Sequence, residues 1–320
     1  MNPSHRILLT GASGALGYHL LKAMAAREDT SVLGLLRSDS KTHGTYPNVD
    51  YRRIDFTGKE SVARVVSEFR PTCIVHSAAS GLQFPRPKWF DLVRFNVEVS
   101  IGLCECAAAM PGCHFVYIST GLGYRDQGRP LNESDPMDTL HPYGASKAAA
   151  DLLVRSAAAE FNVPTTVIRP FSFTGPADPP TRLFPALLRA AAEGQAMDLS
   201  PGEQRRDHCA TADIAAGIAA AVFAHPVSPG EQRIFNLGSG DPITLRAMVE
   251  SVASQLGLDV ALNFGARAYA PHEPMHLVAD ITKARAVLGW RPKINLAYSV
   301  WELARATHPD LKLQEPRRLL

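Results

Sequence analysis

An apolar run near the start of the chain leads directly into three glycines spaced three residues apart, Gly11, Gly14 and Gly17. After a strand, this spacing permits a tight turn, close approach of backbone to a pyrophosphate, and close packing of a helix on the sheet. The N-terminus of that helix then faces the phosphates. No Gly-Lys-Ser or Gly-Lys-Thr follows, which excludes a P-loop. The predicted dinucleotide contacts of this turn are Gly11, Ser13, Gly14, Ala15, Leu16 and Gly17.

Strand-like runs at 7–9, 32–36, 73–76, 115–119 and 165–169 alternate with helical stretches. This alternation predicts an α/β fold with a doubly wound, parallel, Rossmann-type sheet. Past residue 176 two prolines interrupt the chain, a helix is expected over 183–194, and the apolar segments shorten. We therefore expect a dinucleotide-binding domain over residues 1–172, to which residues 208–237 return. A smaller substrate lobe is expected over 173–207 and 238–320.

Composition limits the kinds of partner and compartment. The 320-residue chain has a net charge of +2 with scattered Lys and Arg, so it offers no basic surface for nucleic acid. It contains no apolar run near the ~20 residues of a membrane span, and no signal peptide is expected before the first strand. Five cysteines, an odd number without zinc spacing, predict reduced thiols, no metal site and a cytoplasmic protein.

Tyr143 and Lys147 stand four residues apart in an alanine-rich helical stretch. Residues at this spacing share one face of a helix. A phenol titrates near pH ~10, and an adjacent ammonium favours the phenolate and so lowers the phenol pKa. The pair is a candidate proton donor. Taken alone, the pattern is equally typical of an exposed helix with a solvated lysine.

Further motifs follow in a fixed order along almost the whole chain. They lie at residues 53–56, 74–79, 96–97, 117–120, 168–176, 205–208, 235–238, 279–284 and 288–292. With the glycine turn and the Tyr143 and Lys147 pair, they make the chain resemble the extended short-chain dehydrogenase/reductase family, in its NAD-dependent epimerase/dehydratase branch. The resemblance implies an NAD(P)-dependent oxidoreductase that acts on a nucleotide-linked sugar.

The resemblance also implies roles for individual residues. Thr120 would polarise the reacting C–O group, Tyr143 would act as general acid and base, and Lys147 would tune Tyr143 and hold the nicotinamide ribose. Ser119 is the neighbouring alternative. Strand geometry sends Ser119 and Thr120 to opposite faces, so only one of them is expected to reach the substrate. Further implied cofactor contacts are Asp55, Phe56, Ser77, Ala78, Ala79, Asn96 and Pro170. For Asp55 a turn residue remains the alternative. For Asn96 the alternatives are a contribution through a water and a residue that caps or orients a helix.

The end of the second strand bears on the choice of dinucleotide. An acidic residue there selects NAD through the ribose hydroxyls, whereas an Arg accommodates the additional phosphate of NADP. No acid stands at Leu36, and Arg37 and Ser38 follow it. We therefore expect NADP, with NAD as the alternative. A solvated Arg37 in a loop is the simpler interpretation of the same residues.

Substrate contacts are expected in the second half of the chain. Arg206 resembles the family's contact to a nucleotide diphosphate, and a structural pair with Asp207 is its alternative. Ser172 stands where many sugar-nucleotide enzymes have Asn. Ala270 falls about where they have a second arginine, for which Arg267 is the candidate substitute.

The sequence favours NADPH-dependent reduction of a keto sugar, with Tyr143 as proton donor. The acid and base pair that dehydratases carry after the Thr is replaced by Gly121 and Leu122, which disfavours 4,6-dehydration. The alternatives are a nucleotide-sugar 4-epimerase with tightly bound NAD and a reductase of a non-sugar carbonyl compound. The intact set of Thr120, Tyr143 and Lys147 argues against a protein that binds a cofactor as a sensor without turnover.

The helices near 96–110 and 145–159 are expected to pair across a two-fold axis in a homodimer. Burial of these helices within one subunit is the alternative.

Overall fold

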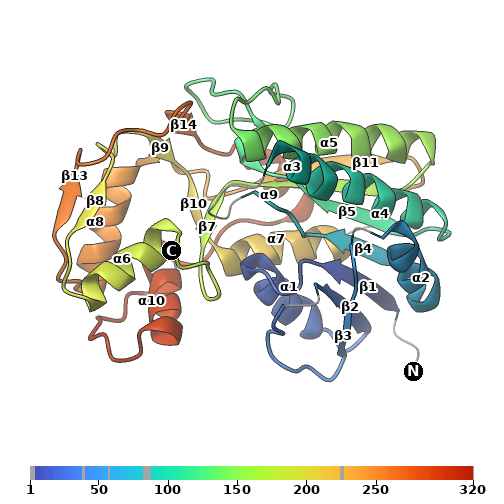
Figure 1. The fold of residues 1–320 in the computed structure, drawn as a ribbon, viewed down its shortest axis with the longest axis horizontal. Coiled ribbons are helices and arrows are strands. Elements are labelled where there is room, and N and C mark those ends of the chain that lie inside the picture. Colours follow the sequence, from blue (N-terminus) through green and yellow to red (C-terminus); the bar gives the residue numbers. More distant parts are fainter. Residues whose placement is uncertain (1–3, 38–39, 57, 82–87, 224–226, 320) are drawn as a thin grey trace.

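The computed structural model describes residues 4–37, 40–56, 58–81, 88–223 and 227–319. A seven-stranded sheet in the order β11-β6-β5-β4-β1-β2-β3 forms the larger domain, and every pair of neighbours is parallel (Figure 1). The predicted doubly wound fold is confirmed. The strands are β1 (His5–Thr10), β2 (Thr30–Leu36), β3 (Val49–Arg53), β4 (Cys73–His76), β5 (His114–Ile118), β6 (Thr165–Pro170) and β11 (Gln232–Leu237).

Helices cover both faces of this sheet. Side chains alternate between the faces, so Leu8 packs in one core cluster while Ile7 and Leu9 pack in the other. One face carries α1 (Ala15–Ala25), α7 (Thr211–Phe223) and α9 (Thr282–Leu288). The opposite face carries α2 (Lys59–Phe69), α4 (Val99–Ala108) and α5 (Pro142–Glu160). The short elements α3 (Trp89–Val93), η1 (Arg94–Glu98) and η2 (Gly121–Gly123) connect them.

A smaller lobe lies beside the sheet and has a core of its own (Figure 1). Its helices are α6 (Leu183–Ala192), α8 (Leu245–Leu256) and α10 (Leu296–Thr307). Small sheets of two or three strands complete the lobe and connect it to the larger domain. They contain β7 (Ser172–Thr174), β8 (Met197–Leu199), β9 (Arg205–Arg206), β10 (His208–Ala210), β12 (Ile243–Thr244), β13 (Leu262–Phe264) and β14 (His276–Leu277).

The last third of the chain contributes to both domains. Helix α9 packs on α7 and β11 in the larger domain, and Trp290 Nε1 donates to the Asp213 carbonyl at 2.9 Å. Residues 238–320 therefore do not all lie in the lobe, although the sequence assigned them there as one block. No helix in the described ranges is both long enough and apolar enough to cross a membrane.

The switch in strand order lies between β1 and β4, the central strands of the larger domain. From β1 the chain continues through β2 and β3 to one side, and from β4 through β5 and β6 to the other. Ligands of doubly wound folds bind outside the carboxyl ends of the strands at such a point. The fold thus places the glycine turn, which follows β1, at the edge of the sheet where a ligand site is expected.

Candidate active site

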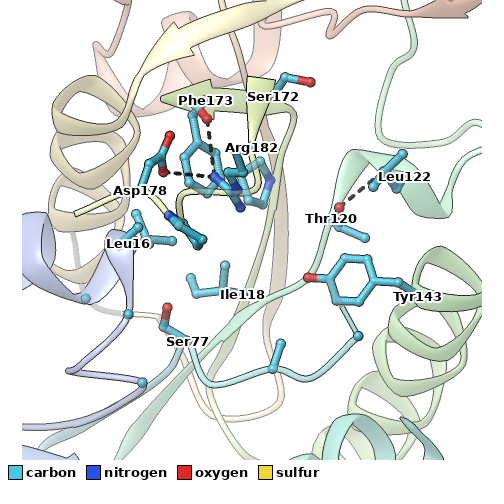
Figure 2. Close-up of a pocket in the computed structure, with 18 of the residues that line it drawn as sticks. Leu16, Ser77, Ile118, Thr120, Leu122, Tyr143, Ser172, Phe173, Asp178 and Arg182 are labelled. Atoms are coloured by element: carbon cyan, nitrogen blue, oxygen red, sulfur yellow. Dashed lines mark hydrogen bonds and ion pairs between the residues drawn. The ribbon is translucent and has the colours of Figure 1, made fainter. Parts of the chain in front are cut away.

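One cavity of about 660 Å³ runs from the glycine turn, past the ends of β4, β5 and β6, to the smaller lobe. Figure 2 shows residues of both domains directed into it. Most of the site residues predicted from sequence line this cavity. They are Gly11, Ser13, Gly14, Ala15, Leu16, Gly17, Arg37, Phe56, Ser77, Ala78, Ala79, Thr120, Tyr143, Pro170, Ser172 and Arg206.

The glycine turn has the shape that a dinucleotide requires. Gly11 has a φ of 73°, and a Cβ there would lie 2.7 Å from the Ala78 backbone nitrogen. A Cβ on Gly17 would overlap the Gly11 carbonyl, so the helix can pack this closely only with glycine. Gly14 is the N-cap of α1 and supplies no side-chain cap, which leaves amide groups of the first turn available to an anion.

Thr120 and Tyr143 come together because two short elements pack against each other. Thr120 follows β5, and its Oγ1 accepts a hydrogen bond from the Leu122 amide at 3.2 Å at the start of η2. Tyr143 lies in the first turn of α5, which begins at Pro142. A Cβ on Gly144 would overlap the Leu122 carbonyl, so glycine allows α5 to approach η2. Both side chains are nearly buried, at 7% and 8% exposure, and they lie side by side in the cavity wall (Figure 2).

Burial controls the ionisation of Tyr143 in the ligand-free protein. Desolvation raises the pKa of its phenol to about 12, and the positive charge of Arg182 partly opposes this. Lys147 is not among the groups that shift this pKa, so its predicted influence on Tyr143 stays a prediction. Lys147 lies one turn further into α5, and burial lowers its own pKa to about 7.

Lys147 carries a buried ammonium whose hydrogen-bonding capacity is not satisfied by the described residues. Its side chain is 1% exposed, and its Nζ has no hydrogen-bond partner among the described residues. Its Nζ lies over the ring of Tyr117, 4.2 Å from the ring centroid. Ribose hydroxyls would supply acceptors for an ammonium at this position. The residues present thus fit a nicotinamide dinucleotide, from the glycine turn to Lys147.

Asn96 has the role of its predicted alternative, a residue that orients a helix, and not that of a cofactor contact. Its side chain is fully buried, and its Oδ1 accepts from the Ser80 amide at 2.8 Å. Its Nδ2 donates to the Ser80 carbonyl and to Ser146 Oγ, both at 2.8 Å. All these groups belong to the protein, so Asn96 fixes the loop after β4 against α5. It does not line the cavity, and its predicted cofactor contact is corrected to a positioning role.

Three other predicted dinucleotide contacts are not found among the residues that line the cavity, and the buried Lys147 is the first of them. Asp55 is exposed after β3 and is not among the lining residues, whereas its neighbour Phe56 is. Ser38 lies outside the described residues. Arg37 lines the cavity with an exposed side chain, so the structure leaves its predicted contact to a phosphate as a proposal.

Of the predicted substrate contacts, Thr120, Ser172 and Arg206 line the cavity and Arg267 does not. Arg206 lines it, is largely buried, and forms an ion pair with Glu273. Asp207 is not its partner, because that carboxylate accepts from the backbone amides of Gly240 at 3.0 Å and Ala279 at 2.9 Å. Arg267 is exposed and lies away from the cavity, so its predicted role as the second substrate arginine is not supported.

The structure adds residues that the motifs did not reveal. Arg182, His208 and Glu273 also line the cavity. Arg182 lies in an irregular segment before α6, where sequence periodicity gives no signal. Ser119 lines the cavity together with Thr120, and its Oγ has no hydrogen-bond partner in the described part of the chain. Both hydroxyls can therefore reach the cavity, and the choice between Ser119 and Thr120 as the polarising residue stays open. Thr120 remains the predicted one.

Comparison with known proteins agrees with this geometry. A UDP-glucose 4-epimerase of Lactobacillus helveticus is 25% identical over 313 residues, which cover 90% of this chain and 92% of that protein. The crystal structure of a UDP-glucose 4-epimerase of Thermotoga maritima with UDP-glucose superimposes with a TM-score of 0.85 at 21% identity, over 95% of this chain and 99% of that one. A UDP-glucuronic acid 4-epimerase of Bacillus cereus, crystallised with UDP-glucuronic acid and NAD, gives a TM-score of 0.82 at 23% identity, over 94% and 98% of the two chains.

The sequence model of one family matches residues 7–238, which include the glycine turn, the catalytic set and six of the seven strands in full. Only the first strand, β1, begins before this range. The chain is an enzyme and belongs to the NAD dependent epimerase/dehydratase family.

Proposed function

We propose that the protein is a nucleotide-sugar 4-epimerase that works with a tightly bound NAD. The observation that carries this proposal is the continuity of one cavity. It joins the glycine turn, the hydroxyls of Thr120 and Tyr143, and the guanidinium of Arg206. A dinucleotide at one end and a nucleotide diphosphate at the other would bring a sugar between them, beside Tyr143.

The relatives favour this reading over NADPH-dependent reduction of a keto sugar. The similar proteins are named as 4-epimerases of UDP-glucose and UDP-glucuronic acid, and the Bacillus cereus enzyme was crystallised with NAD. We carry both features over to this chain as part of the proposal. Arg37, which suggested NADP, lines the cavity with an exposed side chain. Water can solvate its charge there, so the residue does not require a cofactor phosphate.

NAD bound between the glycine turn and Lys147 would supply the hydride chemistry at the reacting carbon of the sugar. The residues of this chain handle the proton. Tyr143 accepts the proton of the reacting hydroxyl and later gives it back, and Thr120 hydrogen-bonds the same oxygen. Lys147 holds the ribose with its Nζ, which orients the dinucleotide against the cavity wall. Its charge, restored by that contact, lowers the pKa of Tyr143 toward the working range.

Elimination of water is not part of the proposal. The two positions after Thr120 are Gly121 and Leu122, whose side chains cannot transfer a proton. A Cβ on Gly121 would lie 2.8 Å from the ring of Phe171, so an acidic side chain at that position would also require the ring to move. Epimerisation needs one acid and base group, which Tyr143 supplies.

The experiment that tests the proposal starts from purified protein. After gel filtration, we expect about one equivalent of NAD per chain, measured by enzymatic cycling of the released cofactor. Without added dinucleotide, the protein should interconvert the 4-epimers of UDP-glucose or of UDP-glucuronic acid, followed by anion-exchange chromatography. Protein free of dinucleotide that instead oxidises NADPH in proportion to an added 4-keto sugar nucleotide would show that the reductase reading is right.

A further inference from the structure

Arg206 carries a charge that the ligand-free protein has to neutralise within the cavity wall. Its side chain is only 10% exposed, and its Nη1 donates to the Arg205 carbonyl at 2.9 Å. Burial lowers the pKa of the guanidinium, and the negative charges of Glu273 and Asp126 oppose this effect. A buried charge is costly unless an opposite charge accompanies it. Arg206 therefore needs an anion both before and after a ligand binds.

Glu273 supplies that anion in the ligand-free protein. Its Oε1 accepts from Arg206 Nη2, and both residues line the cavity. Asp126 does not take this place, because its carboxylate accepts from the backbone amides of Gly128 and His276, both at 2.8 Å. Glu273 thus occupies the guanidinium that would hold the substrate diphosphate in the proposed function.

The backbone keeps Glu273 near Arg206 without burying it. Strand β14 begins three residues after Glu273 and pairs with β9, which places His276 opposite Arg205 (Figure 1). Every residue from 265 to 275 is exposed or only partly buried, and none belongs to a core cluster. The carboxylate can therefore leave the guanidinium without disturbing a core. Three residues of chain nevertheless limit its distance from the paired strands to about 10 Å.

A displaced Glu273 still acts on a bound diphosphate. Charges interact over a Debye length, which is about 8 Å at physiological salt and longer where solvent is excluded. A nucleotide sugar carries one negative charge on each phosphate. The terminal phosphate of a free nucleoside diphosphate ionises a second time, with a pKa of about 6. The carboxylate therefore repels the free nucleoside diphosphate more strongly than the nucleotide sugar.

We propose that Glu273 is a specificity residue that selects nucleotide sugars against free nucleoside diphosphates. It pairs with Arg206 in the ligand-free protein, gives way to the substrate diphosphate, and then repels further negative charge. The inference rests on the proposed function, which places a nucleotide sugar in this cavity. Enzymes that transfer the sugar from its nucleotide release the nucleoside diphosphate, so a reaction that consumes the product generates the ligand that Glu273 disfavours.

The test compares the affinities of UDP-glucose and UDP, measured by calorimetry, in wild type, E273Q and E273D. We expect E273Q to bind UDP roughly tenfold more tightly than wild type and UDP-glucose roughly threefold more tightly, because the more negative ligand gains more from loss of the carboxylate. The preference for UDP-glucose should therefore fall roughly threefold. E273D keeps the charge, so its preference should stay within about twofold of wild type.

E203Q is the matched control. Glu203 lies three residues before Arg206, is exposed, and does not line the cavity. Both affinities of E203Q should equal those of wild type. The amide oxygen of the E273Q side chain can still accept from Arg206, so this variant is expected to fold, and its melting temperature checks that expectation.

An unchanged ratio of the two affinities in E273Q overturns the inference. Weaker binding of UDP, UDP-glucose and UMP alike would show that Glu273 orients Arg206 or holds the nucleoside, and this result also overturns it. If the wild-type protein binds neither UDP nor UDP-glucose, the proposed function fails and the inference fails with it. The expected change in affinities without any epimerisation would refute the proposed reaction and leave the inference supported.

Discussion

The Nζ of Lys147 lies 4.2 Å from the centroid of the Tyr117 ring and has no hydrogen-bond partner among the described residues. A buried ammonium without partners is costly, and burial lowers its pKa from 10.5 to about 7. A ligand that supplies hydrogen-bond acceptors to this ammonium would offset the cost. We interpret Lys147 as a position where stability of the ligand-free fold is reduced in favour of binding.

This interpretation predicts that Lys147→Met stabilises the protein once dinucleotide has been removed. Between pH 7 and 10.5 the unfolded chain holds the lysine proton and the folded chain does not, so the wild-type penalty shrinks as pH rises through this window. The melting temperature of the variant should exceed that of wild type at pH 6, and the gap should narrow toward pH 9. Turnover and dinucleotide affinity should both fall. A variant that melts below wild type at pH 6 would contradict the account.

Tyr143→Phe removes the proposed acid and base and no other group. We expect the rate of epimerisation to fall at least ~100-fold, because general acid and base catalysis contributes on that scale. Binding of UDP-glucose and retention of NAD should remain close to wild type, measured by calorimetry and by cofactor release. A rate within a few-fold of wild type would remove Tyr143 from the mechanism.

Gly144→Ala tests the packing that brings Tyr143 to Thr120. The new Cβ would overlap the Leu122 carbonyl, so α5 must move away from η2. We expect kcat to fall more than ten-fold with a smaller change in KM. Gly102→Ala is the control, because a Cβ at that position in α4 meets nothing within 4 Å. That change should leave kcat unaltered and stabilise the helix by up to ~1 kcal/mol. Comparable activity in the two variants would show that the approach of α5 to η2 is unimportant.

The predicted homodimer remains a proposal that the exposed surface of α5 makes testable. Leu152 and Leu153 are 65% and 44% exposed on that helix, which packs beside α4. We expect a dimer mass by light scattering at micromolar concentration, and a monomer for Leu152→Asp combined with Leu153→Asp. A monomeric wild-type protein under these conditions would rule the interface out.

Local patterns were enough to predict much of the fold. Continuous apolar runs gave the central strands, because strands buried on both faces need apolar side chains at every position. The edge strand β3 was missed, since its residues Val49–Arg53 are mostly polar and only partly buried. The returning strand β11 was predicted from its motif and is found beside β6.

The site was predictable where a backbone requirement fixes the residue type, as at Gly11 and Gly17. It was not predictable where a side chain is placed by tertiary packing. Asn96 looked like a ligand contact, but the distant Ser80 and Ser146 satisfy its amide group. Arg182 gave no signal, because its position depends on a cavity formed between two domains.

The central claim is that hydride leaves the reacting carbon and returns to it within one active site. The most direct measurement uses UDP-glucose carrying deuterium at C4, incubated with the purified protein in ordinary water without added cofactor. We predict a 4-epimer that keeps the deuterium at C4, as seen by mass spectrometry and NMR. Product that has exchanged its deuterium for solvent hydrogen, or product formed only when NADPH is added, would contradict the account.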